Sequence, residues 1–131
     1  MPRNRNVVVF ASAAYAVADA RESDWIDNPD HNSAYIVVDC TVDAASGSMV
    51  ATIEGYDPTS AKAYVVATMG AVASVSTMVD LVGSKVAAAE DDGAGVTLCH
   101  DLPLPRKWRV VMTHADTDSL TYSVAACYVN G

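Results

Sequence analysis

The chain has 131 residues, of which 51% are hydrophobic and 18% are charged. This composition fits one domain with its own core and excludes a disordered chain, which would need low hydrophobicity and high charge. The formal net charge of −8 disfavours nucleic acid as a partner, because an acidic surface repels phosphate. No stretch approaches the roughly 20 apolar residues of a membrane span, so no membrane partner is expected.

The N-terminal segment combines a basic start with a short apolar run, as secretory signal peptides do. The run extends only from Val7 to Phe10, and β-branched residues dominate it, so a first strand is the better interpretation. Before it lies a basic arm, residues 1–6, with Arg3 and Arg5. We expect this arm to precede a single β-sandwich domain over residues 7–131.

Further along the chain, apolar and polar side chains alternate as in half-buried strands. The runs 35–42 and 49–54 are separated by a turn-like segment and are expected to pair as a hairpin. The runs 108–113 and 120–129 are expected to form a terminal hairpin in the same way. The side chains expected to point inward are Ile36, Val38, Cys40, Val42, Met49, Ala51, Ile53, Trp108, Val110, Met112, Leu120, Tyr122, Val124, Ala126 and Tyr128.

The central part of the chain predicts three more strands. A turn at 57–60 precedes a strand over 62–69, the run 72–82 forms a longer strand, and 96–100 forms a short one. The loop 83–95 could hold one helical turn. With about eight short strands and no convincing helix, the sequence predicts an all-β fold, an antiparallel β-sandwich or barrel of jelly-roll or immunoglobulin-like type.

Residues that could carry chemistry do not form a recurrent motif. Cys99 and His100 are adjacent, but neighbours on a strand point to opposite faces and cannot share a site. The acids at 91–92 and 116–118 fit turn chemistry better than a calcium loop. Three cysteines without close spacing argue against a disulfide framework or a zinc site. We therefore expect no catalytic residue, no metal and no cofactor, and a protein that is not an enzyme.

The remaining candidates are residues that could contact a partner protein. The basic N-terminal arm contrasts with the acidic body and could dock onto an acidic neighbour, and Arg106, Lys107 and Arg109 form a second basic cluster. Trp25 lies in the acidic segment 22–32, as either an interface anchor or local cover of the core. The full candidate interface comprises Arg3, Arg5, Val7, Val8, Val9, Phe10, Trp25, Arg106 and Lys107.

Two segments carry a family resemblance. Residues 49–64 read MVATIEGYDPTSAKAY, and residues 104–124 read LPRKWRVVMTHADTDSLTYSV. Together they resemble two hairpin motifs of small virion-associated proteins that tailed bacteriophages of actinobacteria encode. The resemblance extends from about Val7 onward and implies a β-sandwich that decorates the capsid or forms a minor head or tail component. The acidic segment 22–32 departs from the family pattern.

The expectation is therefore a structural protein of a phage, made in the cytoplasm of the bacterial host and located on the capsid surface of the virion. In the first interpretation it is a decoration, or cement, protein that binds the major capsid protein as a homo-oligomer, most simply a trimer. In the second it is a minor tail or head–tail joining protein. A third, of another class, is a carbohydrate-binding module on the virion surface, which an exposed aromatic platform would favour.

Overall fold

The computed structural model describes residues 5–16, 19–28, 31–42, 47–83 and 97–129, the last range from residue 102 onward with its side chains. These residues form ten strands and no helix, so no helix in this part of the chain could cross a membrane. The strands are β1 (Arg5–Tyr15), β2 (Ala20–Glu22), β3 (Ile26–Asp27), β4 (Ser33–Val42), β5 (Met49–Asp57), β6 (Lys62–Val72), β7 (Ser76–Gly83), β8 (Thr97–Asp101), β9 (Lys107–His114) and β10 (Leu120–Val129).

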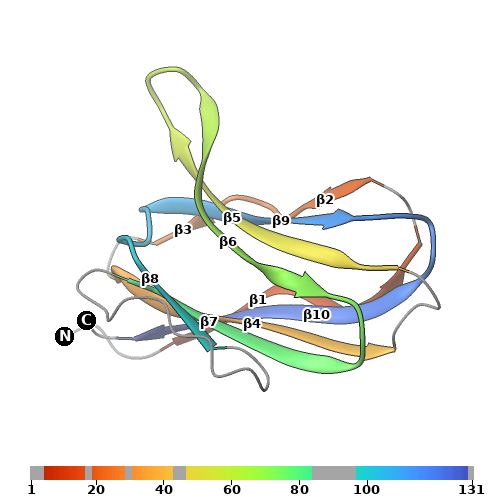
Figure 1. Ribbon diagram of the computed structural model, residues 1–131. Coiled ribbons are helices and arrows are strands. Elements are labelled where there is room, and N and C mark those ends of the chain that lie inside the picture. Colours follow the sequence, from red (N-terminus) through yellow and green to blue (C-terminus); the bar gives the residue numbers. More distant parts are fainter. Residues whose placement is uncertain (1–4, 17–18, 29–30, 43–46, 84–96, 130–131) are drawn as a thin grey trace.

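The strands form two sheets that lie face to face (Figure 1). One sheet has the order β1-β10-β4-β7-β8, and the other has the order β2-β9-β5-β6, with β3 also paired to β9. The pairings are antiparallel except for β7 and β8, which are parallel. The predicted all-β sandwich is confirmed. Its ten strands exceed the expected eight because two short strands were not predicted, β2, which ends at Glu22, and β3, which lies within the acidic segment 22–32.

The core follows from the period of two along the strands. On β5, β9 and β10 alternate residues are buried, and their side chains meet between the sheets. Trp108 of one sheet and Tyr128 of the other are both 0% exposed, and the indole nitrogen donates a 2.9 Å hydrogen bond to the tyrosine hydroxyl. This bond satisfies both polar groups inside the core, as buried polar groups require.

Both predicted hairpins are wrong. β4 pairs with β10 and β7, whereas β5 pairs with β6 and β9 in the opposite sheet, so the segment between β4 and β5 crosses between sheets. β9 and β10 also belong to different sheets. Alternation identifies the side of a strand that faces the core, but both sheets face the same core. A hairpin turn within one sheet and a segment that crosses from one sheet to the other therefore give the same alternation of apolar and polar residues.

Three smaller expectations also need correction. The inward position expected for Val42 is wrong, since this residue is 55% exposed at the end of β4. The run 72–82 is divided by a bend, because β6 ends at Val72 and β7 begins at Ser76. The first strand begins at Arg5 rather than at Val7, so two residues of the expected arm belong to β1. Residues 1–4 and the expected helical turn in the loop 83–95 lie outside the described residues.

The hairpin of β5 and β6 projects beyond the body of the sandwich (Figure 1). Its register shifts between Ile53 and Glu54, where Ile53 pairs with Ala67 but Glu54 pairs with Val65. Val66 is thus an extra residue on β6, and a β-bulge of this kind bends and twists the strand that carries it. The bulge explains why the outer half of the hairpin leaves the plane of its sheet.

Candidate interaction surface at the hairpin end

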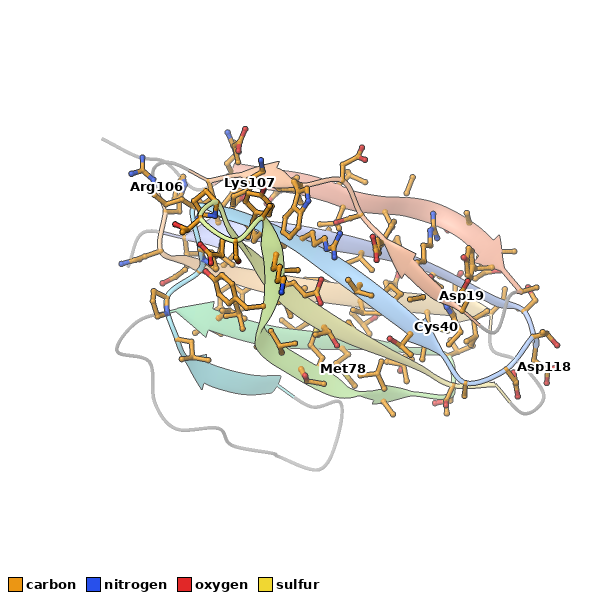
Figure 2. The ribbon with its side chains drawn as sticks, turned by 90° about the horizontal axis from the view of Figure 1, so that it is seen from above. Asp19, Cys40, Met78, Arg106, Lys107 and Asp118 are labelled. Atoms are coloured by element: carbon orange, nitrogen blue, oxygen red, sulfur yellow. The ribbon has the colours of Figure 1, made fainter. Side chains whose placement is uncertain are left out.

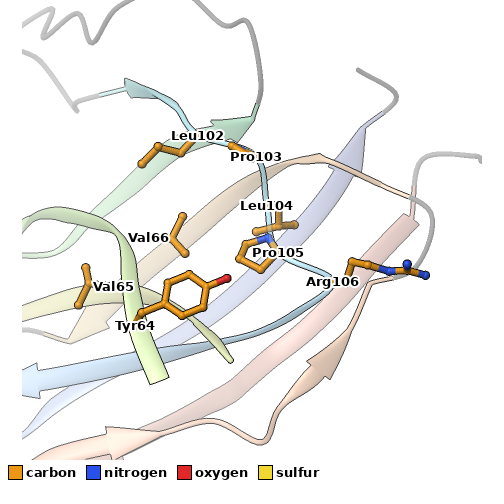
Figure 3. Close-up of a pocket in the computed structure, with 8 residues that line it drawn as sticks. All are labelled: Tyr64, Val65, Val66, Leu102, Pro103, Leu104, Pro105 and Arg106. Carbon is orange, nitrogen blue, oxygen red and sulfur yellow. The ribbon is translucent and has the colours of Figure 1, made fainter. Parts of the chain in front are cut away.

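A concave surface lies where the projecting hairpin faces the segment 102–106. One hollow, with a volume of about 380 Å³, lies between β6 and this segment (Figure 3). A second, of about 420 Å³, adjoins it beside the tip of the hairpin. We call the first the apolar groove. Its lining residues are Tyr64, Val65, Val66, Leu102, Pro103, Leu104, Pro105 and Arg106.

One wall of the groove is an irregular segment held in place from behind. Leu104 is 4% exposed and anchors the segment in the core, while its backbone nitrogen donates a 2.9 Å hydrogen bond to the carbonyl of Asn32. The buried Asn28 donates a 3.2 Å hydrogen bond from its side-chain nitrogen to the carbonyl of Pro105. These contacts leave Leu102, which is 45% exposed, on the outer side of the segment.

The other wall is the outer half of β6, which is apolar yet exposed. Tyr64 is 48% exposed and Val65 is 60% exposed. Tyr64 pairs with Gly55 across the hairpin, and its ring lies so close that a Cβ atom on Gly55 would be 2.5 Å from the ring carbon Cζ. The glycine therefore lets the ring lie flat against β5 instead of standing away from the sheet.

A cluster of aromatic and charged side chains continues from the second hollow onto β9. The Lys107 ammonium lies 4.7 Å from the centre of the Tyr56 ring, and that ring meets Trp25 edge-on at 5.2 Å. The Arg109 guanidinium lies 4.4 Å from the centre of the indole. It also forms ion pairs of 2.8 Å with Glu54 and 3.0 Å with Glu22. Trp25 is therefore half-buried and packed within the chain.

The structure places basic candidate residues at this same end of the sandwich, which we call the hairpin end. Figure 2 shows Arg106 and Lys107 at one end of the molecule and Asp19 and Asp118 at the other. Arg5 belongs to the hairpin end too, because its guanidinium lies 5.1 Å from the ring of Tyr128, the partner of Trp108. Arg3 lies outside the described residues.

The candidates on β1 divide between surface and core. Val8 is 71% exposed, and Val7 and Val9 are partly buried against the core. Phe10 is 7% exposed and its ring lies 4.3 Å from the guanidinium of Arg21, so its side chain belongs to the core of this chain. β1 is an edge strand already paired with β10 on one side, and register shifts after Val8 and after Phe10 turn Phe10 inward.

The candidate residues for chemistry have structural partners where they are described. The His114 ring bridges the Asp19 carbonyl at 2.8 Å and the Tyr122 hydroxyl at 2.9 Å, and the His31 ring stacks on Tyr128 with 5.0 Å between centres. The side chains of Cys99 and His100 lie outside the described part. Within that part, no group of three or more His, Cys, Asp or Glu side chains is placed to hold a metal ion.

Sequence reasoning missed the apolar groove, although two signals point to it. Tyr64, Val65 and Val66 are consecutive apolar residues that break the alternation, and such a run on an edge strand exposes at least one apolar side chain. The segment 102–105 reads LPLP, and its prolines exclude it from a ladder. Neither signal reveals that the two segments face each other, because that depends on the projection of the hairpin.

No family model matches the chain, and no curated protein matches it in sequence. Among solved structures, a chain from infectious bursal disease virus, strain Gx, superposes with a TM-score of 0.52 at 10% identity, over 100% of this chain and 34% of that chain. A chain from strain Gt of that virus gives 0.47 at 12% identity, over 99% and 33%. A chain from Bacillus endospore appendages, described as disulfide-linked pili, gives 0.46 at 16% identity, over 99% and 93%.

The present chain thus spans about a third of the length of the viral chains. At 10% identity, the similarity to the strain Gx chain shows a shared fold.

Proposed function

We propose that this protein is a structural component of a bacteriophage particle, and specifically a decoration protein on the outer capsid shell. The observation that supports this best is the fold, since the whole chain resembles about a third of a chain in a virus structure, with a TM-score of 0.52. The resemblance of residues 49–64 and 104–124 to phage virion proteins supports the same assignment. The proposed partners are the major capsid protein and further copies of this chain, arranged as a trimer.

The distribution of charge suggests how such a protein would attach. The chain carries a net charge of −8, yet Arg5, Arg106 and Lys107 gather at the hairpin end. This end would face an acidic surface of the shell or of a neighbouring copy. Each exposed ion pair contributes only about 0–1 kcal/mol, so firm attachment would come from repetition around a symmetric site.

The test is the copy number of the protein in purified particles, measured by quantitative mass spectrometry against the major capsid protein. A decoration protein should be present in a fixed, high ratio to the capsid protein, because it occupies symmetric positions over the shell. A few copies per particle would instead indicate a tail or head–tail joining protein. Absence from particles purified from cells that express the protein would refute a virion role.

A further inference from the structure

The sheet edge beside the apolar groove is open. β6 is the last strand of its sheet, and in the described part of the chain no strand pairs with it on the side away from β5. The outer half of β6, from Lys62 to Val65, is exposed. Unpaired backbone N–H and C=O groups on an exposed edge are a template for another strand.

The wall opposite this edge offers apolar contacts to a docked segment but few backbone groups that could compete with β6 for its hydrogen bonds. Leu102, Pro103 and Pro105 face Tyr64 and its neighbours across the gap (Figure 3). Proline has no N–H to donate, so an extended segment in the gap would pair with β6 alone and pack its side chains against the other wall. A volume of about 380 Å³ lies within the range of pockets that bind small ligands and holds a few apolar side chains.

One end of the groove carries positive charge. The Arg106 side chain points outward there, beyond Pro105, and its guanidinium forms no ion pair with any of the described residues (Figure 3). Lys107 lies next to it and, with Arg106, lines the adjoining hollow. On a chain of net charge −8, this local excess of cations selects a segment that carries a carboxylate.

We propose that the apolar groove is a docking site for an extended acidic–apolar segment of a partner protein, which adds as a strand to the free edge of β6. Alternate side chains of the segment would pack against Val65 and Leu102, and a carboxylate at one end would reach Arg106. This is recognition by strand addition, in which main-chain hydrogen bonds give affinity and side-chain pockets give specificity. A second copy of this chain is the competing occupant, and the sedimentation measurement below distinguishes it from an extended segment.

The inference does not require the virion role, and its test uses no phage particles. The full chain is immobilised and used to select from a displayed library of random peptides about ten residues long, close to the length of strand that β6 can pair. Affinities of the selected peptides are then measured by fluorescence polarisation against the wild-type chain and its variants. Selected sequences should alternate apolar residues and carry Asp or Glu near one end.

The substitutions V65D and V75D form a matched pair, because both residues are 60% exposed and only Val65 lines the groove. V65D should lower the affinity for the selected peptides about tenfold or more, the loss expected when one apolar contact is removed. V75D should leave their affinity unchanged. R106E should lower the affinity for acidic peptides about fivefold, and exchanging the peptide's carboxylate for Lys should restore binding to R106E.

A selected peptide with N-methyl groups on alternate residues tests the strand addition itself, since it cannot donate those backbone hydrogen bonds. Its binding should be lost. The proposal is overturned if no peptide is enriched, if V65D and V75D behave alike, or if the N-methylated peptide binds as well as its parent. It is also overturned if sedimentation shows a dimer of the chain that V65D, but not V75D, dissociates, because the groove would then belong to a second copy.

Discussion

Trp108 illustrates how a single side chain connects the two sheets. It pairs with Gly55 on its own sheet, its ring meets the Tyr128 ring edge-on with 6.2 Å between centres, and it donates the hydrogen bond across the core. The sequence predicted its burial because it shares a strand face with Val110 and Met112. The hydrogen bond to a residue twenty positions away could not be predicted, since it requires the two strands to face each other from opposite sheets.

The substitution Trp108→Ala should lower the free energy of unfolding by about 3–5 kcal/mol, the usual cost of emptying a large aromatic site. Trp25→Ala is the matched control. Trp25 is half-buried and packs against Arg109 and Tyr56 on the surface of its sheet, so its loss should cost clearly less. Urea denaturation of both variants measures the difference. Equal losses would contradict the assignment of Trp108 to the centre of the core.

The buried tyrosines predict a loss of stability at alkaline pH. Burial raises the pKa of Tyr122 and of Tyr128 above the ordinary value of 10.0, although the nearby charge of Arg21 and the hydrogen bond from Trp108, respectively, partly oppose the shift. As the pH rises past about 10, the unfolded chain loses these protons before the native state does, so the free energy of unfolding falls.

Below about pH 10 both tyrosines are protonated in the native and in the unfolded chain, so their contribution to the free energy of unfolding is fully present. Denaturation midpoints measured between about pH 8 and pH 11 should therefore decline most steeply above pH 10. Tyr128→Phe removes one of the two titrating groups and should make the decline shallower, even though the variant starts from a lower stability. Parallel curves for the wild type and the variant would show that the ionisation of Tyr128 is not linked to folding.

Gly55 and Gly83 both lie on strands, and each has a side chain close to its Cα. The two neighbouring side chains differ in how freely they can move. The three atoms nearest to a Cβ atom on Gly55 would all belong to the side chain of Tyr64, which is 48% exposed and can rotate away. A Cβ atom on Gly83 would overlap the Oγ of the buried Ser33 and lie 3.3 Å from its backbone Cα, where nothing can move freely.

Gly83→Ala should therefore destabilise the protein by about 1–3 kcal/mol, the usual cost of overpacking a core. Gly55→Ala should cost less than about 1 kcal/mol, because a strand favours Ala over Gly and only an exposed ring has to move. Thermal unfolding of the two variants makes the comparison. A larger cost for Gly55→Ala would show that the Tyr64 ring is fixed in place. In that case the outer half of the hairpin would be as rigid as the body.

At the scale of elements, the sequence predicts strands well and their pairing poorly. Met49, Ala51 and Ile53 are buried as alternation requires, and the turn at 57–60 does connect β5 to β6. Their neighbours across the sheet depend on contacts distant in sequence. β4, for example, pairs with β10 through Val38 and Val124, and no local pattern encodes that choice.

Over the whole molecule, part of the candidate surface was visible in the sequence. Arg106 and Lys107 stand out as a basic pair, and the structure places them beside the hollows. That Arg5 shares their end of the sandwich follows only from the pairing of β1 with the end of β10. The structure therefore brings Arg5, Arg106 and Lys107, which are scattered in the sequence, to one end of the sandwich.

The last prediction concerns attachment of the whole protein to a particle. Residues 1–4 contain Arg3 and precede β1, which begins at Arg5, so deleting them leaves every described strand intact. The denaturation midpoint should not change. If the basic end contacts an acidic shell, the truncated protein should co-sediment less with undecorated particles than the full chain. A variant with residues 1–4 replaced by an uncharged segment of the same length separates the effect of charge from that of length.

Salt should distinguish this electrostatic contact from a purely apolar one. Exposed charges are screened beyond about 10 Å at 0.1 M ionic strength and beyond about 3 Å at 1 M, so attachment of the full chain should weaken as salt is added. The truncated and neutral variants should start weaker and lose less, since they have one fewer arginine to screen. Equal co-sedimentation of all three forms at low and at high salt would show that Arg3 has no part in attachment, and would leave the contact to Arg5, Arg106, Lys107 and the apolar side chains around them.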